Sequence, residues 1–350
     1  MKVVRSLVLA TIVVALALAI SGVQAASYVA AVTGPTDGSV ENNVTVYNVA
    51  GGASTVQQTL AVGWGATAVA FDASGNLYVA QRDYFNIGSG PDAIDEYAYN
   101  SGTGTWNTNT ALVCVVDNHP YRMSTGMAVD ASGNIYVGEN GSAAGVIYKY
   151  TASTNSTTAS VFYTLPNTYN GKMDDIRVDA ASQNLWVADK NSGIWDFNIA
   201  TATNTLIADP YGYPGDFGMD ISPVNGNVYM AVYSYTGILT ANPTTGAFQS
   251  FVRAINPDPY MHVPQSMVFG PDWNGDGVKD LYLADSTNSN IQVFDGSNPN
   301  NWLGTITTTT NVSNLTAWSS SPVPEPSSLL VMIPGVASLL GLIVRKRNIS

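Results

Sequence analysis

The sequence predicts an all-β fold built from a repeated unit, and three observations lead to this prediction. Only 11% of the 350 residues are charged, whereas the chain holds 32 Gly and 19 Tyr and is rich in Thr, Ser, Asn and Val. Helical bundles carry Glu, Lys and Arg on their exposed faces, so this composition disfavours them. A hydrophobic content of 45% is enough for a core and disfavours disorder. Finally, similar pairs of apolar segments recur along the chain.

The first 26 residues have the pattern of an export signal. Lys2 and Arg5 form a basic start, residues 7–20 form an uncharged apolar run, and small residues at Ala25 and Ala26 offer a cleavage site. The alternative is a permanent N-terminal anchor, for which the apolar run is short. We therefore expect the mature chain to begin near residue 27.

Five segments of the body share one pattern, in which an apolar strand, a polar turn and a second strand with apolar and aromatic residues follow one another. This pattern predicts β-hairpins. The segments are AVAFDASGNLYVAQRD (68–83), MAVDASGNIYVGEN (127–140), IRVDAASQNLWVADKN (176–191), MDISPVNGNVYMAVY (219–233) and MVFGPDWNGDGVKDLYLADSTN (267–288).

A third strand is expected after each hairpin, and a Thr-rich outer strand follows it. The third strands are expected at 94–99, 146–150, 193–197, 237–240 and 290–294, with outer strands such as 159–165 and 247–252. The turn residues Asp72, Asp130 and Asp179 are 58 and 49 residues apart. Four short antiparallel strands recurring at about this interval are typical of β-propeller blades, whose sheets pack radially because none buries both faces alone.

The N-terminal part of the body supplies an incomplete sixth unit. Residues 27–32, 43–49 and 54–62 match the second, third and fourth strands, and residues 312–318 match the missing first strand. Closing the ring with one C-terminal and three N-terminal strands would remove the free sheet edges. We predict a six-bladed β-propeller over residues 27–320.

Two segments carry a family resemblance. VDASGNIYVGEN (129–140) and VDAASQNLWVADKNSGIWDF (178–197) resemble NHL-type repeats, and the hairpins are also similar to those of gluconolactonase-like six-bladed propellers. The resemblance concerns the architecture of roughly residues 27–318, and a shared fold does not fix function.

The C-terminal end combines three features. Residues 321–326 read SPVPEP, residues 328–344 are an uncharged apolar stretch near the lower limit for a membrane helix, and Arg345, Lys346 and Arg347 follow. This tripartite pattern resembles the PEP-CTERM sorting signal of Gram-negative bacteria. The resemblance implies processing by an exosortase near Pro324, Glu325 and Pro326, an inner-membrane intermediate, and release to the cell surface or an exopolysaccharide matrix. The alternative is a simple C-terminal anchor.

The charge and cysteine content exclude several functions. The net charge is −12, and because the two ends hold five of the 13 basic and one of the 25 acidic residues, residues 27–323 carry −16. Such a surface disfavours nucleic-acid binding and favours cations. Cys114 is the only cysteine, so an intramolecular disulfide and a cysteine-based zinc site are excluded. We expect Cys114 on an outer strand.

The loop within the last hairpin is a candidate calcium site. Its side chains offer oxygens at positions 1, 3, 5 and 9, a carbonyl at position 7 and a glycine at position 6, as suits Ca²⁺. The candidate ligands are Asp272, Asn274, Asp276, Val278 and Asp280. The loop looks like the calcium loops of FG-GAP repeats in integrin-type propellers. The alternative is an Asx-rich turn satisfied by its own backbone, which is also how we interpret the simpler turns at Asp72 and Asp130.

Acidic residues at the ends of second strands form a second metal candidate. Glu139, Asp189 and Asp285, with Asp83, would lie near one rim of a propeller. Gluconolactonase-like propellers hold a divalent metal in the channel with Glu, Asn and Asp, whereas NHL-like repeats use the acid to cap the turn into the third strand. We favour the capping role.

The two histidines, His119 and His262, are weak catalytic candidates in loops that lead into first strands. In lyases with this fold, similar loop histidines act as a zinc ligand or a general base. The sequence has no phosphate-binding loop, dinucleotide fingerprint or Ser/His/Asp pattern.

These observations favour an exported, non-catalytic propeller at the cell surface or in the exopolysaccharide matrix, stabilised by Ca²⁺ and binding a polysaccharide or a protein. The alternative function is a secreted metal-dependent lactonase or lyase that uses the central channel.

Overall fold

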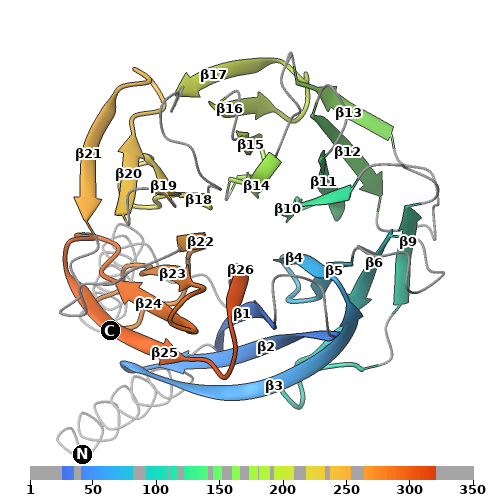
Figure 1. The fold of residues 1–350 in the computed structure, drawn as a ribbon, viewed down its shortest axis with the longest axis vertical. Helices are drawn as coiled ribbons and strands as arrows, with labels where there is room; N and C mark the ends of the chain where they lie inside the picture. The colour runs from blue at the N-terminus through green and yellow to red at the C-terminus, as the bar shows by residue number, and fades with distance from the viewer. Residues whose placement is uncertain are drawn as a thin grey trace, which may run out of the picture.

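The computed structural model is a closed ring of six four-stranded antiparallel sheets, as Figure 1 shows. The predicted all-β, six-bladed β-propeller is therefore confirmed. The structure describes residues 26–34, 41–81, 92–108, 111–116, 122–140, 145–151, 160–165, 173–179, 181–189, 193–208, 218–232, 237–253 and 264–320.

Blade 1 closes the ring and contains both ends of the described chain. Its strands, from the axis outward, are β26 (Val312–Ser319), β1 (Ser27–Thr33), β2 (Glu41–Ala50) and β3 (Ala53–Trp64). Tyr28 pairs with Trp318 in the β1–β26 register, and their rings stack with centroids 5.9 Å apart. The predicted closure by one C-terminal and three N-terminal strands is confirmed.

The other five blades follow in chain order, each starting at the axis. Blades 2 and 3 are β4 (Ala66–Phe71), β5 (Leu77–Gln81), β6 (Asp92–Tyr97) and β9 (Ala111–Val116), then β10 (Arg122–Val129), β11 (Asn134–Asn140), β12 (Val146–Thr151) and β13 (Ser160–Thr164). Blade 4 is β14 (Met173–Val178), β15 (Asn184–Asp189), β16 (Gly193–Asn198) and β17 (Asn204–Ala208). Blades 5 and 6 are β18 (Met219–Ile221), β19 (Val228–Val232), β20 (Gly237–Ala241) and β21 (Phe248–Arg253), then β22 (Pro264–Phe269), β23 (Leu281–Asp285), β24 (Asn290–Phe294) and β25 (Trp302–Thr307).

The core lies between the blades. Six buried clusters fill the six interfaces, and each cluster takes its residues from two neighbouring blades. The six inner strands also contact one another in sequence around the axis. No blade buries both its faces alone, which is why the sheets need the closed ring.

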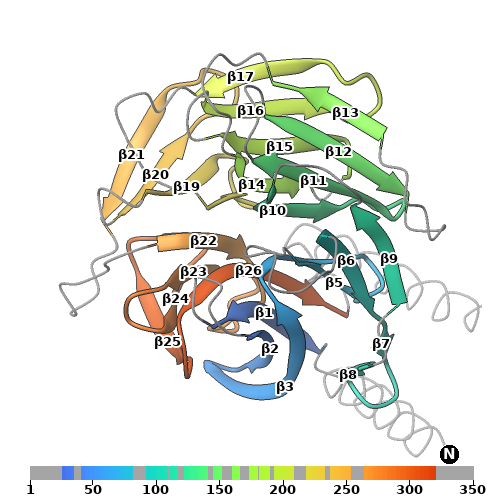
Figure 2. The ribbon, with the colours of Figure 1, turned by 45° about the vertical axis from the view of Figure 1, so that its right-hand side comes forward.

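An additional hairpin extends from blade 2. Strands β7 (Tyr99–Asn100) and β8 (Thr105–Trp106) lie between β6 and the outer strand β9 in the chain, and Figure 2 shows their hairpin projecting beyond the end of the blade. The sequence interpretation extended the third strand to Tyr99 and did not include this hairpin. The third strand ends instead at Tyr97.

The polar turns of the first two hairpins form as expected. The Asp72 carboxylate accepts the backbone amides of Ser74 and Asn76 at 2.8 and 2.9 Å, and Asp130 does the same with Ser132 and Asn134. These aspartates are therefore turn formers.

Both predicted membrane segments, within residues 1–26 and 321–350, fall outside the described residues except for Ala26. In the described part of the chain, no helix combines the length and apolarity that a bilayer crossing requires.

Candidate functional site

The axis of the ring is the first candidate site, because all six inner strands meet there. In a four-stranded blade, one backbone edge of the inner strand has no partner within its own sheet, and buried N–H and C=O groups need partners. The structure supplies them from the side chains of the neighbouring blades.

Four such links follow one another around the ring. The Asp175 carboxylate accepts the amide of Met219 at 3.0 Å, and Asp220 accepts that of Phe269 at 2.6 Å. Ser266 Oγ accepts the Leu315 amide, and Asn314 Oδ1 accepts the Val69 amide, both at 3.1 Å. Each link joins an inner strand to the inner strand of the next blade.

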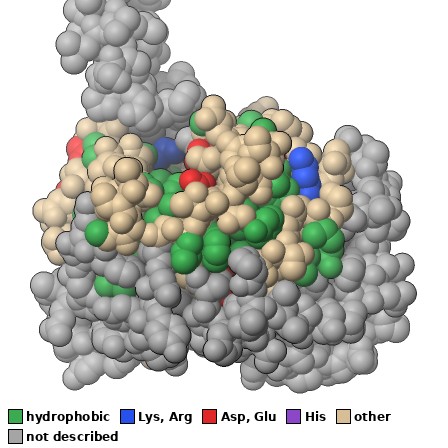
Figure 3. Space-filling model, turned by 90° about the horizontal axis from the view of Figure 1, so that it is seen from above, with side chains coloured by type: hydrophobic (Ala, Val, Ile, Leu, Met, Phe, Trp, Pro, Cys, Tyr) green, Lys and Arg blue, Asp and Glu red, His purple; other side chains and the backbone are tan. Residues whose placement is uncertain are grey.

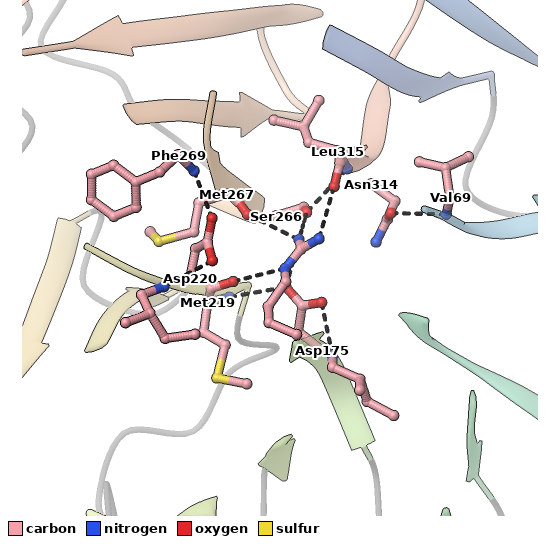
Figure 4. A network of polar contacts seen from close by, with 12 residues as sticks. Val69, Asp175, Met219, Asp220, Ser266, Met267, Phe269, Asn314 and Leu315 are labelled. Carbon is pink, nitrogen blue, oxygen red and sulfur yellow. Dashed lines mark hydrogen bonds and ion pairs between the residues drawn. The ribbon is translucent and has the colours of Figure 1, made fainter. Parts of the chain in front are cut away.

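Arg177 of β14 is the centre of this network (Figure 4). Its Nε donates to the Met219 carbonyl at 3.0 Å, and its Nη1 donates to the Leu315 carbonyl at 3.2 Å. Its Nη2 donates to the Met267 carbonyl at 2.9 Å and pairs with Asp175 at 3.0 Å. One guanidinium on blade 4 therefore binds blades 5, 6 and 1.

Of the acids beside Arg177, Asp175 is buried and Asp220 is half-buried. Asp175 is 1% exposed. Burial raises the pKa of Asp175 to about 6, opposed by the Arg177 charge and by the Met219 amide. Burial also raises the pKa of Asp220, and Arg177 again opposes the change. These carboxylates accept backbone amides with both oxygens, so their chemistry is used in holding the blades together.

A cavity of about 270 Å³ opens at the end of the axis where the inner strands turn into the second strands. All six inner strands contribute to its wall. The polar lining residues are Arg177, Asp179, Asp220, Ser222, Lys279 and Thr316. Neither histidine nor cysteine is among the described residues of this wall.

The predicted calcium loop is closed by its own backbone. Asp272 accepts the amides of Gly275, Asp276 and Gly277 at 2.6, 3.2 and 2.7 Å. The Asp276 carboxylate accepts the Val278 amide at 2.8 Å and lies 3.2 Å from the Asn274 amide nitrogen. This is the arrangement that the Asx-turn alternative predicts.

Asp280 fastens this loop to the next turn of the blade. Its carboxylate is fully buried and accepts the amides of Trp273 at 2.7 Å and Gly296 at 2.9 Å. Burial raises the pKa of Asp280 to about 6, opposed by these amides and reinforced by the charge of Asp272. Within the described residues, no three His, Cys, Asp or Glu side chains are grouped so as to hold a metal ion. Calcium binding by the loop remains a prediction.

The second-strand acids are placed as follows. Asp189 and Asp285 end β15 and β23 opposite the starts of their inner strands, and both are fully buried. Asp285 accepts the Thr287 and Asn288 amides at 3.2 and 3.3 Å, which is the capping role we favoured. Glu139 ends β11, but its side chain lies outside the described residues.

The remaining candidates are not tested by the structure. His119, His262 and Asp83 lie outside the described residues. Cys114 lies on the outer strand β9, as expected, opposite Ile94, and its side chain is outside the described set.

The sequence interpretation missed the Arg177 network. Strand periodicity indicates which face of a sheet a residue occupies, but a side chain that reaches across the axis depends on the ring being closed. Three charged residues, Asp174, Asp175 and Arg177, within the six residues of one inner strand were the available signal.

No protein-family model matches this chain, and a search of curated proteins finds no significant match.

Proposed function

We propose that this chain is an exported β-propeller displayed at the cell surface or in an exopolysaccharide matrix, where it acts as a non-catalytic binding or structural protein. The observation that carries the proposal is the axial network. Arg177, Asp175 and Asp220 bind backbone groups of neighbouring blades, and this structural use of the charged groups at the axis supports a non-catalytic role.

The surface of the ring also supports a binding or structural role. In the side view of Figure 3, the described side chains are mostly hydrophobic or uncharged polar ones, with few acids and bases. This agrees with the low charged fraction of 11%. Such a surface is suited to contact with uncharged matrix components.

Export rests on the two ends of the chain. The resemblance of residues 321–350 to PEP-CTERM signals makes an exosortase the proposed processing partner, with the 328–344 helix in the inner membrane only transiently. The Ser320 amide donates to the Ala26 carbonyl at 2.9 Å. The two ends of the described chain therefore lie side by side.

Calcium is the proposed structural ion of the 272–280 loop. The candidate ligand atoms are oxygens, which Ca²⁺ prefers. Burial raises the pKa of Asp280, and the negative charge of Asp272 adds to this effect. A divalent cation would relieve the repulsion between these two carboxylates. Thermal unfolding in Ca²⁺ and in EDTA tests this, with Asp276→Ala as the variant and Asp72→Ala, in the equivalent turn of blade 2, as the matched control. We expect Ca²⁺ to stabilise the wild type and Asp72→Ala but not Asp276→Ala; equal unfolding temperatures with and without Ca²⁺ would refute the site.

The test of export uses the full chain in a Gram-negative host that carries an exosortase. We expect wild-type protein in the outer-surface and matrix fraction with a shortened C-terminus. A triple change of Pro324, Glu325 and Pro326 to Ala should leave the chain in the inner membrane. The proposal fails if both chains are found in the same fraction.

The non-catalytic part is tested on the purified body. Lactone and polysaccharide substrates should be left intact. Substrate turnover that disappears in Glu139→Ala or Asp189→Ala, together with loss of a tightly held metal ion, would favour the lactonase or lyase alternative instead.

A further inference from the structure

The β7–β8 hairpin is the feature that the propeller fold does not require. The connection between the third and fourth strands of blade 2 runs from Tyr97 to Ala111, whereas β16 and β17 of blade 4 are joined through residues 199–203. An insertion of this length that forms its own structure is usually functional. A crevice of about 640 Å³ lies against it.

Among its described residues, the wall of the crevice holds no Asp, Glu, His, Lys or Arg. Its side chains are amides, hydroxyls and aromatic rings, with Tyr99, Asn100, Ser101, Thr103, Thr105 and Asn107 prominent among them. Amides and hydroxyls both donate and accept hydrogen bonds. Because these groups carry no positive charge, they do not attract ligands that contain phosphate, sulfate or carboxylate groups.

The hairpin is held firmly on the rest of the ring. Gln57 and Gln58 of β3 donate from Nε2 to the carbonyls of Gly104 and Trp106, both at 2.9 Å. The Trp106 amide returns a bond to Gln58 Oε1 at 2.7 Å, and its indole N–H donates to the Gly75 carbonyl at 2.8 Å. Tyr28 packs edge-on against the Trp106 ring. A site on such a supported hairpin would bind with little loss of conformational freedom.

We propose that this crevice binds a neutral saccharide segment of the matrix. This inference rests on the proposed function, and it adds the chemical class of the ligand and the place where the ligand binds. Sugars without charged groups present hydroxyls that both donate and accept hydrogen bonds, which match the amides and hydroxyls of the crevice. A body with a net charge of −16 repels acidic polymers, so the neutral class is favoured. The crevice is open on one side, and residues 98–108 form all of its described lining, so an extended chain could lie along it.

The chain offers a matched pair of variants for the test. The hydroxyls of Thr103 and Thr105 lie 2.7 Å apart in the crevice, and those of Thr201 and Thr203 lie 2.8 Å apart in the corresponding turn of blade 4. In either pair, Thr→Val changes remove the two hydroxyls and keep the β-branched shape of the side chains. Only the first pair lines the crevice.

The experiment is binding of the purified body to a panel of immobilised neutral glycans, with alginate and polygalacturonate as acidic controls. We expect binding to at least one neutral glycan and to neither acidic polymer. Thr103→Val/Thr105→Val should weaken this binding about tenfold, as expected for the loss of hydrogen bonds from two hydroxyls, while Thr201→Val/Thr203→Val should leave it unchanged. If the first variant also melts at a lower temperature, Ser101→Ala, an exposed change, provides the second comparison.

Absence of binding to every neutral glycan, or equal affinities of the two double variants, would overturn the inference. Its failure can be distinguished from failure of the proposed function. If wild type and Thr103→Val/Thr105→Val bind native matrix material equally, the crevice is not the site but the matrix role stands. If wild type does not bind native matrix at all, the binding role fails as well.

Discussion

Arg177 makes hydrogen bonds to the backbone of three other blades with a single side chain. It is 8% exposed and donates to carbonyls of three other blades, while its partner Asp175 is more deeply buried still. A planar guanidinium suits this task, because its five N–H donors are spread over three nitrogens, whereas the three donors of an ammonium leave a single nitrogen. We interpret Arg177 as the residue that ties one half of the ring together at the axis.

Replacing Arg177 tests this interpretation. Arg177→Met should lower the free energy of unfolding by about 3–5 kcal/mol, because it leaves Asp175 buried without its counter-charge. Arg177→Lys should recover only part of the loss. Lys279→Met, which removes an exposed cation at the mouth of the same cavity, should change stability by no more than about 0.5 kcal/mol. Urea denaturation measures all three variants, and an Arg177→Met protein as stable as wild type would contradict the assigned role.

The pH dependence of stability tests Asp175. Its pKa is raised from 3.8 to about 6 in the folded protein, chiefly by burial, so the folded state binds this proton more tightly than the unfolded state. The contribution to stability is therefore fully present below about pH 4 and is lost as the pH rises through about 6. The amide of Asp175→Asn cannot titrate.

The comparison is made between wild type and Asp175→Asn in urea from pH 4 to pH 8. We expect the stability of wild type relative to the variant to fall by on the order of 3 kcal/mol across this range. The contribution of Asp280, whose pKa is raised in the same direction, cancels in the difference. A difference that stays constant would show that the pKa of Asp175 is normal in the folded protein, and one that grows with pH would show that this pKa is lowered; either result would contradict the raised pKa.

At the scale of strands and turns, glycines mark where two inner strands approach most closely. Gly126 of β10 and Gly218, just before β18, stand at the position that Asp175, Ser266 and Asn314 occupy on other inner strands, one residue before a buried apolar side chain. A Cβ on Gly126 would lie 2.6 Å from the Ile176 amide nitrogen, and one on Gly218 would lie 2.4 Å from the Ser266 Cα. Neighbouring blades meet there through backbone alone.

Alanine at these positions should destabilise the ring. Gly126→Ala and Gly218→Ala force backbone apart in a close-packed interface, for which about 1–3 kcal/mol is expected. Gly102→Ala is the control, because its Cβ would approach only the exposed Asn100 side chain, at 3.3 Å. The measurement is the unfolding temperature of the three variants. If Gly126→Ala and Gly218→Ala unfold at the same temperature as Gly102→Ala, the close approach of the inner strands does not contribute to stability.

The sequence allowed most elements to be predicted because each hairpin repeats the same local chemistry. An aspartate that accepts the next backbone amides, as Asp72 and Asp130 do, is encoded within five residues. The strand bounds followed within one or two residues. The β7–β8 hairpin was missed because Ala98 separates β7 from β6, although its turn has the same form as the turn between β16 and β17. Its signal was a Gly-rich turn between Tyr99 and Trp106, which pair across the hairpin.

The site was less predictable. Side chains such as Arg177 and Ser266 acquire their role from contacts between residues 89 positions apart, and local patterns carry no such information. The calcium loop could be proposed from the sequence because its candidate ligands are close together in the chain. The axial network and the crevice at β7–β8 emerge only once the ring is closed.

At the scale of the whole molecule, closure is the property on which the other features depend. The order of the inner strands around the axis, β26, β4, β10, β14, β18 and β22, brings Leu315 within reach of Arg177 and Trp318 against Tyr28. The same closure places Ala26 beside Ser320. The axial network, the support of the hairpin and the common exit of both chain ends all require β26 to pair with β1.

A designed disulfide measures this pairing most directly. Ser27 and Ser319 are opposite one another, with their hydroxyl oxygens 3.3 Å apart, so Ser27→Cys/Ser319→Cys in a Cys114→Ser background should oxidise within one chain, and most of the purified protein should migrate faster on a non-reducing gel. The control, Ser27→Cys/Ser313→Cys, places the second thiol near the other end of β26 and should stay reduced. If Ser27→Cys/Ser319→Cys folds to a β-rich protein yet does not form the bond under oxidising conditions, the ring is not closed by β26.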